Sequence, residues 1–315
     1  MIYIGLDIGG TNIKGAFVTK EGKITHRFGF RVDYSKTQEE IISLIGDSIN
    51  SALKEKEIEK EEVGGIGIGC PGSINSKTGI CEYSNNLNWF DLPIVAMIEK
   101  ATGIKAKISN DANVAMLGEA KFGVGKKYHN LVLLTLGTGV GGGLYLNDQL
   151  YEGEEGKGAE LGHMVIDPDG KECTCGMKGC FEAYASATAL KNMTQEAMEK
   201  HKDSLMWKQV EGDLSKANGI TSFECSKKGD KAAMEVVSKY EDYLAFGIIN
   251  YCNIFRPEAI ILGGGVSSQK EYLTDEIEKR LKEKNYGFKR TPSVKVLVSN
   301  LGNDAGVLGA AALVM

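Results

Sequence analysis

A histidine and three cysteines lie close together in the middle of the chain and form a candidate zinc site. They fall within eighteen residues and are separated by nine, one and four others: His163, Cys173, Cys175 and Cys180. Imidazole and thiolate ligands suit Zn²⁺, and closed sites with three cysteines and one histidine are structural. Glycines and a proline between them allow the backbone to turn the four side chains toward one point. The alternative is a group of reduced thiols without a metal.

Two carboxylates flank this candidate zinc site. Glu160 precedes it and Glu182 follows it, so residues 160–182 form a zinc loop whose ordering would also fix both carboxylates. Ionised carboxylates accept hydrogen bonds from hydroxyl groups. The zinc loop is therefore a candidate site for a polar, hydroxyl-rich ligand.

A glycine turn near the N-terminus has the residues needed to bind a phosphate group. It joins two strand patterns, residues 2–8 and 12–18. Glycine amides and a threonine hydroxyl can approach phosphoryl oxygens, a lysine adds positive charge, and an aspartate at the strand end can hold Mg²⁺ through water. The residues in these roles are Asp7, Gly9, Gly10, Thr11 and Lys14. The alternative is a plain hairpin turn.

The same strand–turn–strand pattern recurs about 130 residues later. Residues 130–136 read as a strand and are followed by a glycine turn, Gly137, Thr138 and Gly139, and by another strand pattern. We interpret this as an internal duplication, in which two glycine turns bind the phosphates of one nucleotide. A third turn, at Gly264 and Gly265, can admit a base or ribose, or else is only a corner between a strand and a helix.

The spacing G-x-G-x-x-G occurs twice but does not indicate a dinucleotide-binding fold. It lies at residues 67–72 and 137–142. That fold requires a helix directly after the glycines. Pro71 interrupts the first copy, and a strand pattern follows the second.

Two further segments carry polar residues that could bind and activate an acceptor. Asn110 and Asp111 follow a strand pattern at residues 104–108 and begin a helix pattern. A carboxylate beside a phosphate-binding turn is where a phosphoryl acceptor would be oriented and deprotonated. The alternative is that either residue only caps the helix. In the loop 84–93, Asn86 offers a donor and an acceptor to a hydroxyl, or else closes an Asx turn.

Five motifs together resemble the signature of the ROK family (repressor, open reading frame, kinase), which includes sugar kinases. D-I-G-G-T-x-x-K covers residues 7–14, N-L-x-W covers 86–89, and N-D-A-N-x-A-x-L-G-E covers 110–119. E-x-G-H covers residues 160–163, and C-x-C-G-x-x-G-C-x-E covers 173–182. The similarity extends over nearly the whole chain.

The resemblance implies a role for each candidate residue. Asp111 is expected to act as the general base on a sugar hydroxyl, and the glycine turns are expected to bind ATP and Mg²⁺. Contacts to the sugar are expected from Asn86, Asn110, Glu160, His163 and Glu182. His163 and the three cysteines are expected to hold the structural Zn²⁺, with one imidazole nitrogen on the metal and the other toward the sugar.

The resemblance also implies an α/β fold of two actin-like (ribonuclease H-like) domains with a cleft between them. The smaller domain is expected to comprise residues 1–115 and 300–315, and the larger one residues 116–299, including the zinc loop. A helix of small residues at 305–311 is expected to return to the N-terminal domain, with Asp304 as its cap. A homodimer or homotetramer is expected.

The expected activity is ATP-dependent phosphorylation of a hexose at its 6-hydroxyl. Residues 158–190 look most like those of bacterial glucokinases, which favours glucose. The alternatives are N-acetylmannosamine, N-acetylglucosamine or fructose as the sugar, and polyphosphate as the donor. A sugar-responsive repressor is disfavoured, because the first motif begins at residue 7 and leaves no room for a helix-turn-helix. A sugar sensor without catalysis is the remaining alternative.

Composition narrows the class of protein further. The 315 residues include 40 glycines and carry a net charge of −5, so no basic surface is expected to attract nucleic acid. No apolar run is long enough to span a membrane, and no signal peptide is recognised. Four cysteines outside the zinc loop, at positions 70, 81, 225 and 252, have no disulfide-framework spacing. The sequence therefore predicts a cytoplasmic protein.

Overall fold

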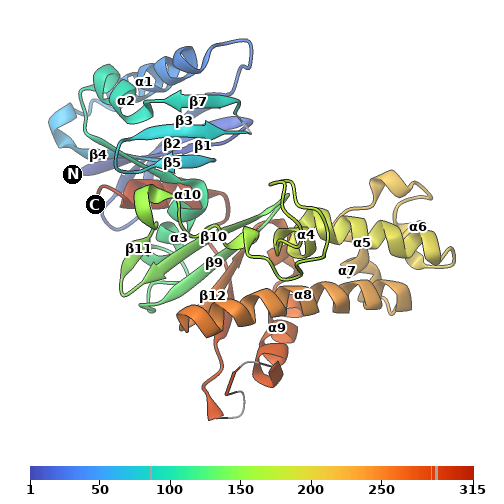
Figure 1. The fold of residues 1–315 in the computed structure, drawn as a ribbon. Coiled ribbons are helices and arrows are strands. Elements are labelled where there is room, and N and C mark those ends of the chain that lie inside the picture. The colour runs from blue at the N-terminus through green and yellow to red at the C-terminus, as the bar shows by residue number, and fades with distance from the viewer. Residues whose placement is uncertain (86, 285, 288–289) are drawn as a thin grey trace. The chain divides into compact units, whose positions relative to one another are not determined.

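The N-terminal residues form a five-stranded mixed sheet, drawn in the computed structural model of Figure 1. The structure describes residues 1–85, 87–284, 286–287 and 290–315. The strand order is β3-β2-β1-β4-β8, with β1–β3 antiparallel and with β4 and β8 parallel to β1. The strands are β1 (Ile2–Ile8), β2 (Asn12–Thr19), β3 (Ile24–Arg31), β4 (Val63–Cys70) and β8 (Ala106–Asn110).

Strand β1 is buried on both faces and shows why its sequence is almost wholly apolar. Side chains alternate between the two faces of a sheet. Ile4, Leu6 and Ile8 belong to one core with helices α1 (Gln38–Glu55) and α2 (Ile94–Thr102). Tyr3 belongs to a second core with helix α10 (Ala305–Ala312). Figure 1 shows α1 and α2 on one side of this sheet and α10 on the other.

Helix α10 packs its backbone directly against its neighbours. A Cβ atom at Gly5 would lie 2.0 Å from the carbonyl oxygen of Val307, and one at Gly67 would lie 1.6 Å from that of Ala310. Any larger residue would clash at either position. The C-terminal helix therefore lies on β1 and β4, as expected from its small residues.

Asp304 occupies the N-cap position of α10, as predicted from sequence, but its side chain makes no capping hydrogen bond. Instead, its two carboxylate oxygens accept hydrogen bonds of 2.7 and 2.9 Å from the guanidinium of Arg27. The guanidinium fork takes both carboxylate oxygens in a bidentate geometry, which directs the side chain toward Arg27 and away from the helix N–H groups.

Helices α1, α2 and α3 (Asp111–Lys121) and a small antiparallel sheet complete this part of the chain. The small sheet has the order β5-β6-β7. Its strands and the short 3₁₀ helices nearby are β5 (Ser73–Asn75), β6 (Ile80–Ser84), β7 (Trp89–Leu92), η1 (Lys60–Glu62), η2 (Glu154–Gly156) and η7 (Gly302–Asp304).

A second five-stranded sheet repeats the order of the first. Its order is β11-β10-β9-β12-β13, and β9, β12 and β13 are parallel. In both sheets three consecutive strands lie side by side. Two later strands then extend the sheet on the other side of the first of these three strands. This repetition agrees with the internal duplication inferred from sequence. The strands are β9 (Leu131–Leu136), β10 (Val140–Leu146), β11 (Gln149–Tyr151), β12 (Ala259–Gly263) and β13 (Lys295–Val298).

Contacts divide the chain into two compact units, with one division inside β10. Unit 1 comprises Met1–His129, Gly143–Ala159 and Asn300–Met315. Unit 2 comprises Asn130–Gly142 and Glu160–Ser299.

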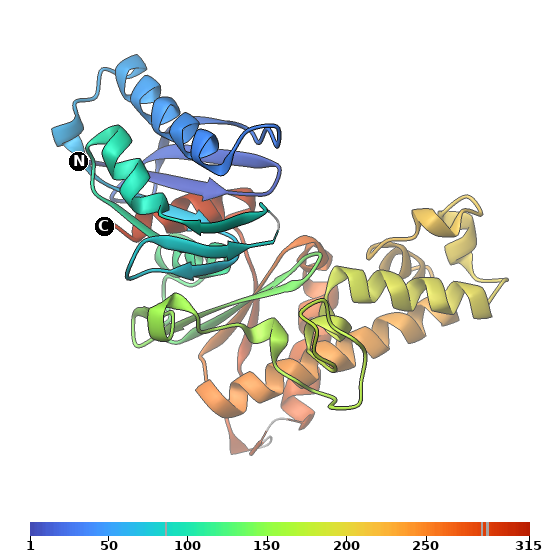
Figure 2. The ribbon, with the colours of Figure 1, turned by 45° about the horizontal axis from the view of Figure 1, so that its top comes forward.

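Unit 2 consists mainly of helices, of which α8 is the longest among the described residues. Residues 193–222 end α5 and form α6, η4 and the start of α7. Figure 2 shows α5 alongside α8, and the two helices are in contact. The helices are η3 (Leu161–His163), α4 (Glu182–Ala185), α5 (Ala187–Lys200), α6 (Leu205–Gln209), η4 (Leu214–Lys216), α7 (Thr221–Ser226), α8 (Lys231–Phe255), η5 (Gly265–Gln269) and α9 (Glu271–Lys284). Within the described ranges, no helix has both the length and the apolar character of a membrane span.

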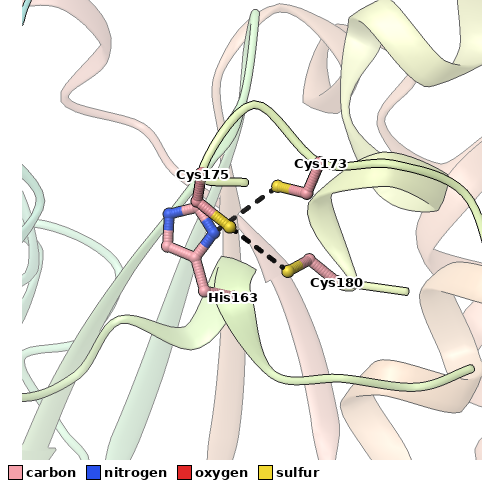
Figure 3. Close-up of side chains that lie close together, drawn as sticks. All are labelled: His163, Cys173, Cys175 and Cys180. Atoms are coloured by element: carbon pink, nitrogen blue, oxygen red, sulfur yellow. Dashed lines mark hydrogen bonds between the residues drawn. The ribbon is translucent and has the colours of Figure 1, made fainter. Parts of the chain in front are cut away.

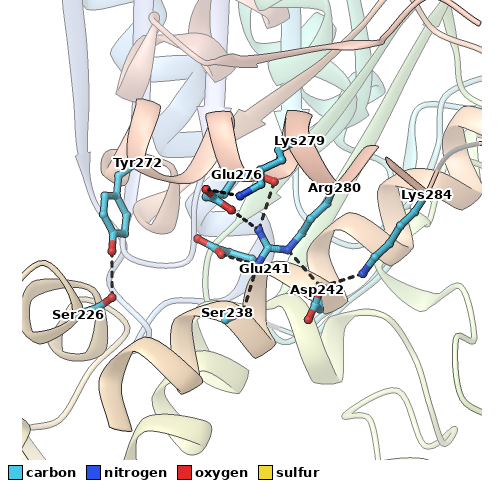
Figure 4. Close-up of polar contacts among 9 residues, drawn as sticks. All are labelled: Ser226, Ser238, Glu241, Asp242, Tyr272, Glu276, Lys279, Arg280 and Lys284. Atoms are coloured by element: carbon cyan, nitrogen blue, oxygen red, sulfur yellow. Dashed lines mark hydrogen bonds and ion pairs between the residues drawn. The ribbon is translucent and has the colours of Figure 1, made fainter. Parts of the chain in front are cut away.

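A polar cluster joins α8 to α9 around a largely buried arginine (Figure 4). Arg280 contacts the carboxylates of Glu241 at 2.9 Å, Asp242 at 3.1 Å and Glu276 at 2.8 Å. Burial raises the pKa of Glu241 to about 7, and the Arg280 guanidinium opposes this rise only in part. Glu241 therefore gains a proton within the neutral range.

This raised pKa predicts a pH-dependent stability. A group whose pKa is higher in the folded state stabilises the fold at low pH, and this contribution is lost as pH rises through the folded value. Relative to Glu241→Gln, the free energy of unfolding of the wild type is expected to fall by about 2–3 kcal/mol between about pH 5 and about pH 8. Urea unfolding of both proteins at each pH measures the difference. Parallel pH profiles would contradict this assignment.

Candidate active site

The N-terminal glycine turn closes the β1–β2 hairpin in unit 1. Ile8 pairs with Ile13, and the amide of Gly9 donates to the carbonyl of Asn12 at 3.0 Å. The carbonyl of Thr11 accepts from Val32 at 2.9 Å, whereas the Thr11 residue itself is exposed. The turn is thus anchored through its backbone and presents a hydroxyl residue to solvent.

Two charged side chains lie at the base of this turn. Asp7 and Lys14 are register partners, and their carboxylate oxygen and ammonium nitrogen are 4.0 Å apart. Burial raises the pKa of Asp7, while Lys14 lowers it. A Cβ atom at Gly306 of α10 would lie 3.0 and 3.1 Å from the Asp7 carboxylate oxygens, so α10 covers this side chain closely. An acid with these surroundings is suited to a cation held through water.

Asn110 and Asp111 lie where β8 gives way to α3. Asn110 is the N-cap of α3, which was the alternative to its predicted sugar contact. Its Oδ1 accepts a hydrogen bond from the amide of Ala112 at 2.9 Å, and its Nδ2 donates one to the carbonyl of Gly72 at 3.1 Å. Asp111 is exposed, and its Oδ1 accepts from the same Ala112 amide at 2.9 Å. A cap role and a ligand role are compatible for Asn110, since each amide atom can form a further hydrogen bond.

The predicted sugar contact at Asn86 lies outside the residues that the structure describes. The neighbouring strands β6 and β7 pair through Ser84 and Trp89. The role of Asn86 therefore stays a prediction.

The second glycine turn follows β9 in unit 2 and is held by helix α5. The carbonyl of Gly137 accepts from the Ala187 amide at 2.8 Å, and that of Thr138 accepts from the Thr188 hydroxyl at 2.7 Å. Sequence reasoning missed Thr188, because its partner lies 50 residues away.

The third glycine turn lies beside the second. A Cβ atom at Gly264 would lie 2.5 Å from the carbonyl oxygen of Leu136, which directly precedes Gly137. Gly264 has φ +79°, which L side chains rarely adopt. At Gly137 and Gly265 a Cβ would meet no atom within 4 Å in the described part of the chain. The structure thus brings together two predicted nucleotide-binding turns with room above the backbone.

The four predicted zinc ligands converge in the zinc loop (Figure 3). Their ligand atoms all lie within 4.8 Å of one another. The Sγ of Cys173 is 3.7 Å from the Nδ1 of His163, and the Sγ atoms of Cys175 and Cys180 are 3.6 Å apart. Ligands at tetrahedral corners around Zn²⁺ are separated by roughly 3.5–3.8 Å, so this donor set fits the ion. Nδ1 faces the cysteines, which leaves Nε2 of His163 for another partner.

Glu182 connects the zinc loop to the second glycine turn. Its Oε2 accepts from the amide of Val140 at 2.9 Å, while its Oε1 lies 3.6 Å from the Sγ of Cys173 and accepts from Thr174 at 3.3 Å. A Cβ at Gly139 would lie 2.2 Å from Glu182 Oε2, so a larger residue there would displace the Glu182 carboxylate. The sequence predicted only a sugar contact for Glu182 and missed this connecting role, which depends on tertiary packing.

Glu160 begins unit 2 and is exposed to solvent. Partial burial of the Glu160 carboxyl raises its pKa, and His163 lowers the same pKa. The nearby Glu182 carboxylate raises it further. Both carboxylates and the imidazole are therefore close enough to interact. This grouping can accept and donate several hydrogen bonds to a polyhydroxyl ligand.

Comparison with known proteins places the chain among relatives of several functions. A glucokinase of Thermotoga maritima is 38% identical over 315 residues, covering 99% of this chain and 96% of that protein. The solved structure of a ROK family glucokinase from Streptomyces griseus, in complex with glucose and AMPPNP, has a TM-score of 0.81, 32% identity and 99% coverage of both chains. A xylose repressor of Bacillus subtilis is 28% identical over 312 residues and is matched over 76% of its length.

The ROK family profile matches residues 3–315. Together with the glucokinase relatives, this match shows that the chain belongs to the ROK family.

Proposed function

We propose that this protein is an ATP-dependent hexose kinase that transfers a phosphoryl group to the 6-hydroxyl of glucose. One observation of geometry carries the proposal. Strands β1, β4 and β8 are parallel, and Asp7, Gly69 and Ser109 form one row across them. Adjacent strands are about 4.8 Å apart, so the backbones of Asp7 and Ser109 are separated by about 10 Å at the same edge of the sheet. Asp111 follows two residues later, which puts the candidate cation ligand and the candidate base within reach of one phosphoryl group.

The residues of unit 1 have complementary roles in this reaction. Asp111 accepts the proton of the sugar 6-hydroxyl as its oxygen attacks the γ-phosphorus. Asp7 would hold Mg²⁺, and the backbone of Gly10 and Thr11 would donate hydrogen bonds to phosphoryl oxygens, while the Gly9 amide closes the turn on the Asn12 carbonyl. Phosphoryl transfer depends mainly on positioning and on stabilisation of charge, and this set supplies both.

The residues of unit 2 bind the remaining parts of the two substrates. The turns at 137–139 and 264–265 hold the nucleotide, and Glu160, His163 and Glu182 bind sugar hydroxyls. Zn²⁺ would be held by His163, Cys173, Cys175 and Cys180 and would supply rigidity to the zinc loop. In this proposal the chain comprises two actin-like domains, residues 1–115 with 300–315 and residues 116–299, as the resemblance implies.

The glucokinase relatives support glucose as the acceptor, since the named glucokinases are 34–38% identical over nearly the full chain. The second candidate is a sugar-responsive regulator, which the match to xylose repressors supports. A kinase turns over ATP in the presence of its sugar, whereas a regulator only binds the sugar. This difference separates the two candidates.

ADP release by the purified protein with Mg-ATP tests the proposal. The sugars are glucose, mannose, fructose, N-acetylglucosamine and N-acetylmannosamine, each compared with a reaction without sugar. We expect glucose to give the highest kcat/KM. Turnover with another sugar alone would keep the reaction and change the substrate. No turnover of any sugar, with either ATP or polyphosphate as the donor, would contradict the kinase proposal and leave the sugar-responsive regulator as the remaining candidate.

A further inference from the structure

Glu119 is a fully buried carboxylate near the end of α3 that the proposed mechanism does not use. Glu119 lies on the helix that begins with Asp111, and Glu119 itself is 0% exposed. Its Oε2 accepts from the amide of Val124 at 3.1 Å, and its Oε1 accepts from the amide of Leu301 at 3.1 Å. One carboxylate thus connects the end of α3 to a segment 182 residues later in the chain.

A buried carboxylate is costly unless its oxygens accept hydrogen bonds. The backbone around Glu119 is arranged for that purpose: its own carbonyl accepts from Gly123 at 3.1 Å and Gly125 at 2.9 Å, which turns the chain back under the side chain. A Cβ at Gly123 would lie 2.0 Å from Oε2. The two hydrogen bonds to Glu119 and the close packing of Gly123 therefore fix the position of its carboxylate.

The Leu301 segment leads through η7 into α10, which contacts both Asp7 and the helix α3 that begins at Asp111. Gly306 of α10 lies against the Asp7 carboxylate. Further along, a Cβ at Gly309 would lie 1.6 Å from the carbonyl oxygen of Val114 in α3. Figure 1 shows α10 next to α3, in agreement with their extensive contacts. Helix α10 therefore spans from the strand of Asp7 to the helix of Asp111.

We propose that Glu119 is a positioning residue that fixes the distance between Asp7 and Asp111. Its bond to Leu301 sets the point at which α10 begins, and α10 in turn sets the place of Asp7 relative to α3. This inference rests on the proposed kinase function. Loss of the bond would let α10 shift, and displacement of reacting groups by about 1 Å can lower a rate by about 100-fold.

Glu119→Gln tests the inference, because an amide can accept only one of the two backbone hydrogen bonds and places an NH₂ group against the other N–H. We expect kcat per folded molecule to fall at least about 10-fold. The KM values for sugar and ATP should change less than about 3-fold, since the residues that bind them are untouched. Glu241→Gln is the matched control: it alters a buried glutamate of unit 2 and should leave kcat unchanged.

A second variant removes the same bond from the other side. Leu301→Pro deletes the amide donor at a φ of −79°, which proline accommodates. If Glu119 acts through Leu301, the double variant should have nearly the kcat of the poorer single variant, because the two changes remove one interaction.

The outcomes separate the inference from the function on which it rests. A wild type without turnover on any sugar or donor would overturn the kinase proposal and this inference with it. If the wild type turns over ATP and the folded Glu119→Gln variant has the same kcat, the inference alone would be overturned. Equal losses in Glu119→Gln and in Glu241→Gln would assign Glu119 a role in stability only.

Discussion

Replacing Asp111 with asparagine is expected to lower kcat by about 100- to 10,000-fold, the usual contribution of a general base. Asparagine retains the shape of the side chain and the acceptor that binds the Ala112 amide, so α3 should still begin at the same residue. It cannot take the proton of the attacking hydroxyl. The rate constant should be measured with saturating sugar and Mg-ATP, together with the dissociation constant of the sugar.

Asn110→Asp is the matched control for this change, since it alters the adjacent residue and keeps a side-chain oxygen for the cap. It should reduce sugar affinity while leaving measurable turnover, because the base is retained. Normal kcat in Asp111→Asn would show that Asp111 is not the base. A loss of folded protein in that variant would instead indicate that its role is in the structure of α3.

Removal of the metal is expected to weaken sugar binding by about 10- to 100-fold, the usual effect of losing a structure that orients binding residues. Without zinc, no ion would join His163 to the three cysteines, and the loop that carries Glu182 would be released. Because Glu182 also holds the Val140 amide, the second glycine turn should loosen as well. Sugar titration by calorimetry, before and after chelation and after zinc is restored, measures the effect.

Cys175→Ser should reproduce the effect of chelation, as it removes one thiolate from the cluster. Cys225→Ser is its control, because that cysteine lies in α7 outside the four-residue set. Unchanged sugar affinity after complete loss of zinc, confirmed by elemental analysis, would contradict the proposed role of the loop. Equal losses in both variants would point to a general effect on unit 2.

Local features of the fold were predictable from sequence, because they depend on neighbouring residues. The β1 strand is encoded by a continuous apolar run, the turn after Ile8 by glycines, and the start of α3 by a capping side chain at Asn110. The convergence of His163 with the cysteines followed from spacing within a single loop. These predictions needed no knowledge of distant contacts.

Features that depend on distant partners could not be predicted. Asp304 has the sequence context of a helix cap, but Arg27 lies 277 residues away in the chain and captures its carboxylate. Glu119 ends the motif at residues 110–119, but nothing in that motif identifies Leu301 as its partner. Long-range hydrogen bonds leave no periodic signal in the sequence, so a single chain gives no reason to expect them.

The position at which the sugar is phosphorylated tests the central claim most directly. Phosphorus–proton correlation NMR of a reaction with Mg-ATP and glucose identifies the oxygen that carries the new phosphate. The proposed placement of Asp111 predicts phosphate on the 6-oxygen and no ADP release with 6-deoxyglucose. Phosphate at another position, or turnover of 6-deoxyglucose, would contradict it.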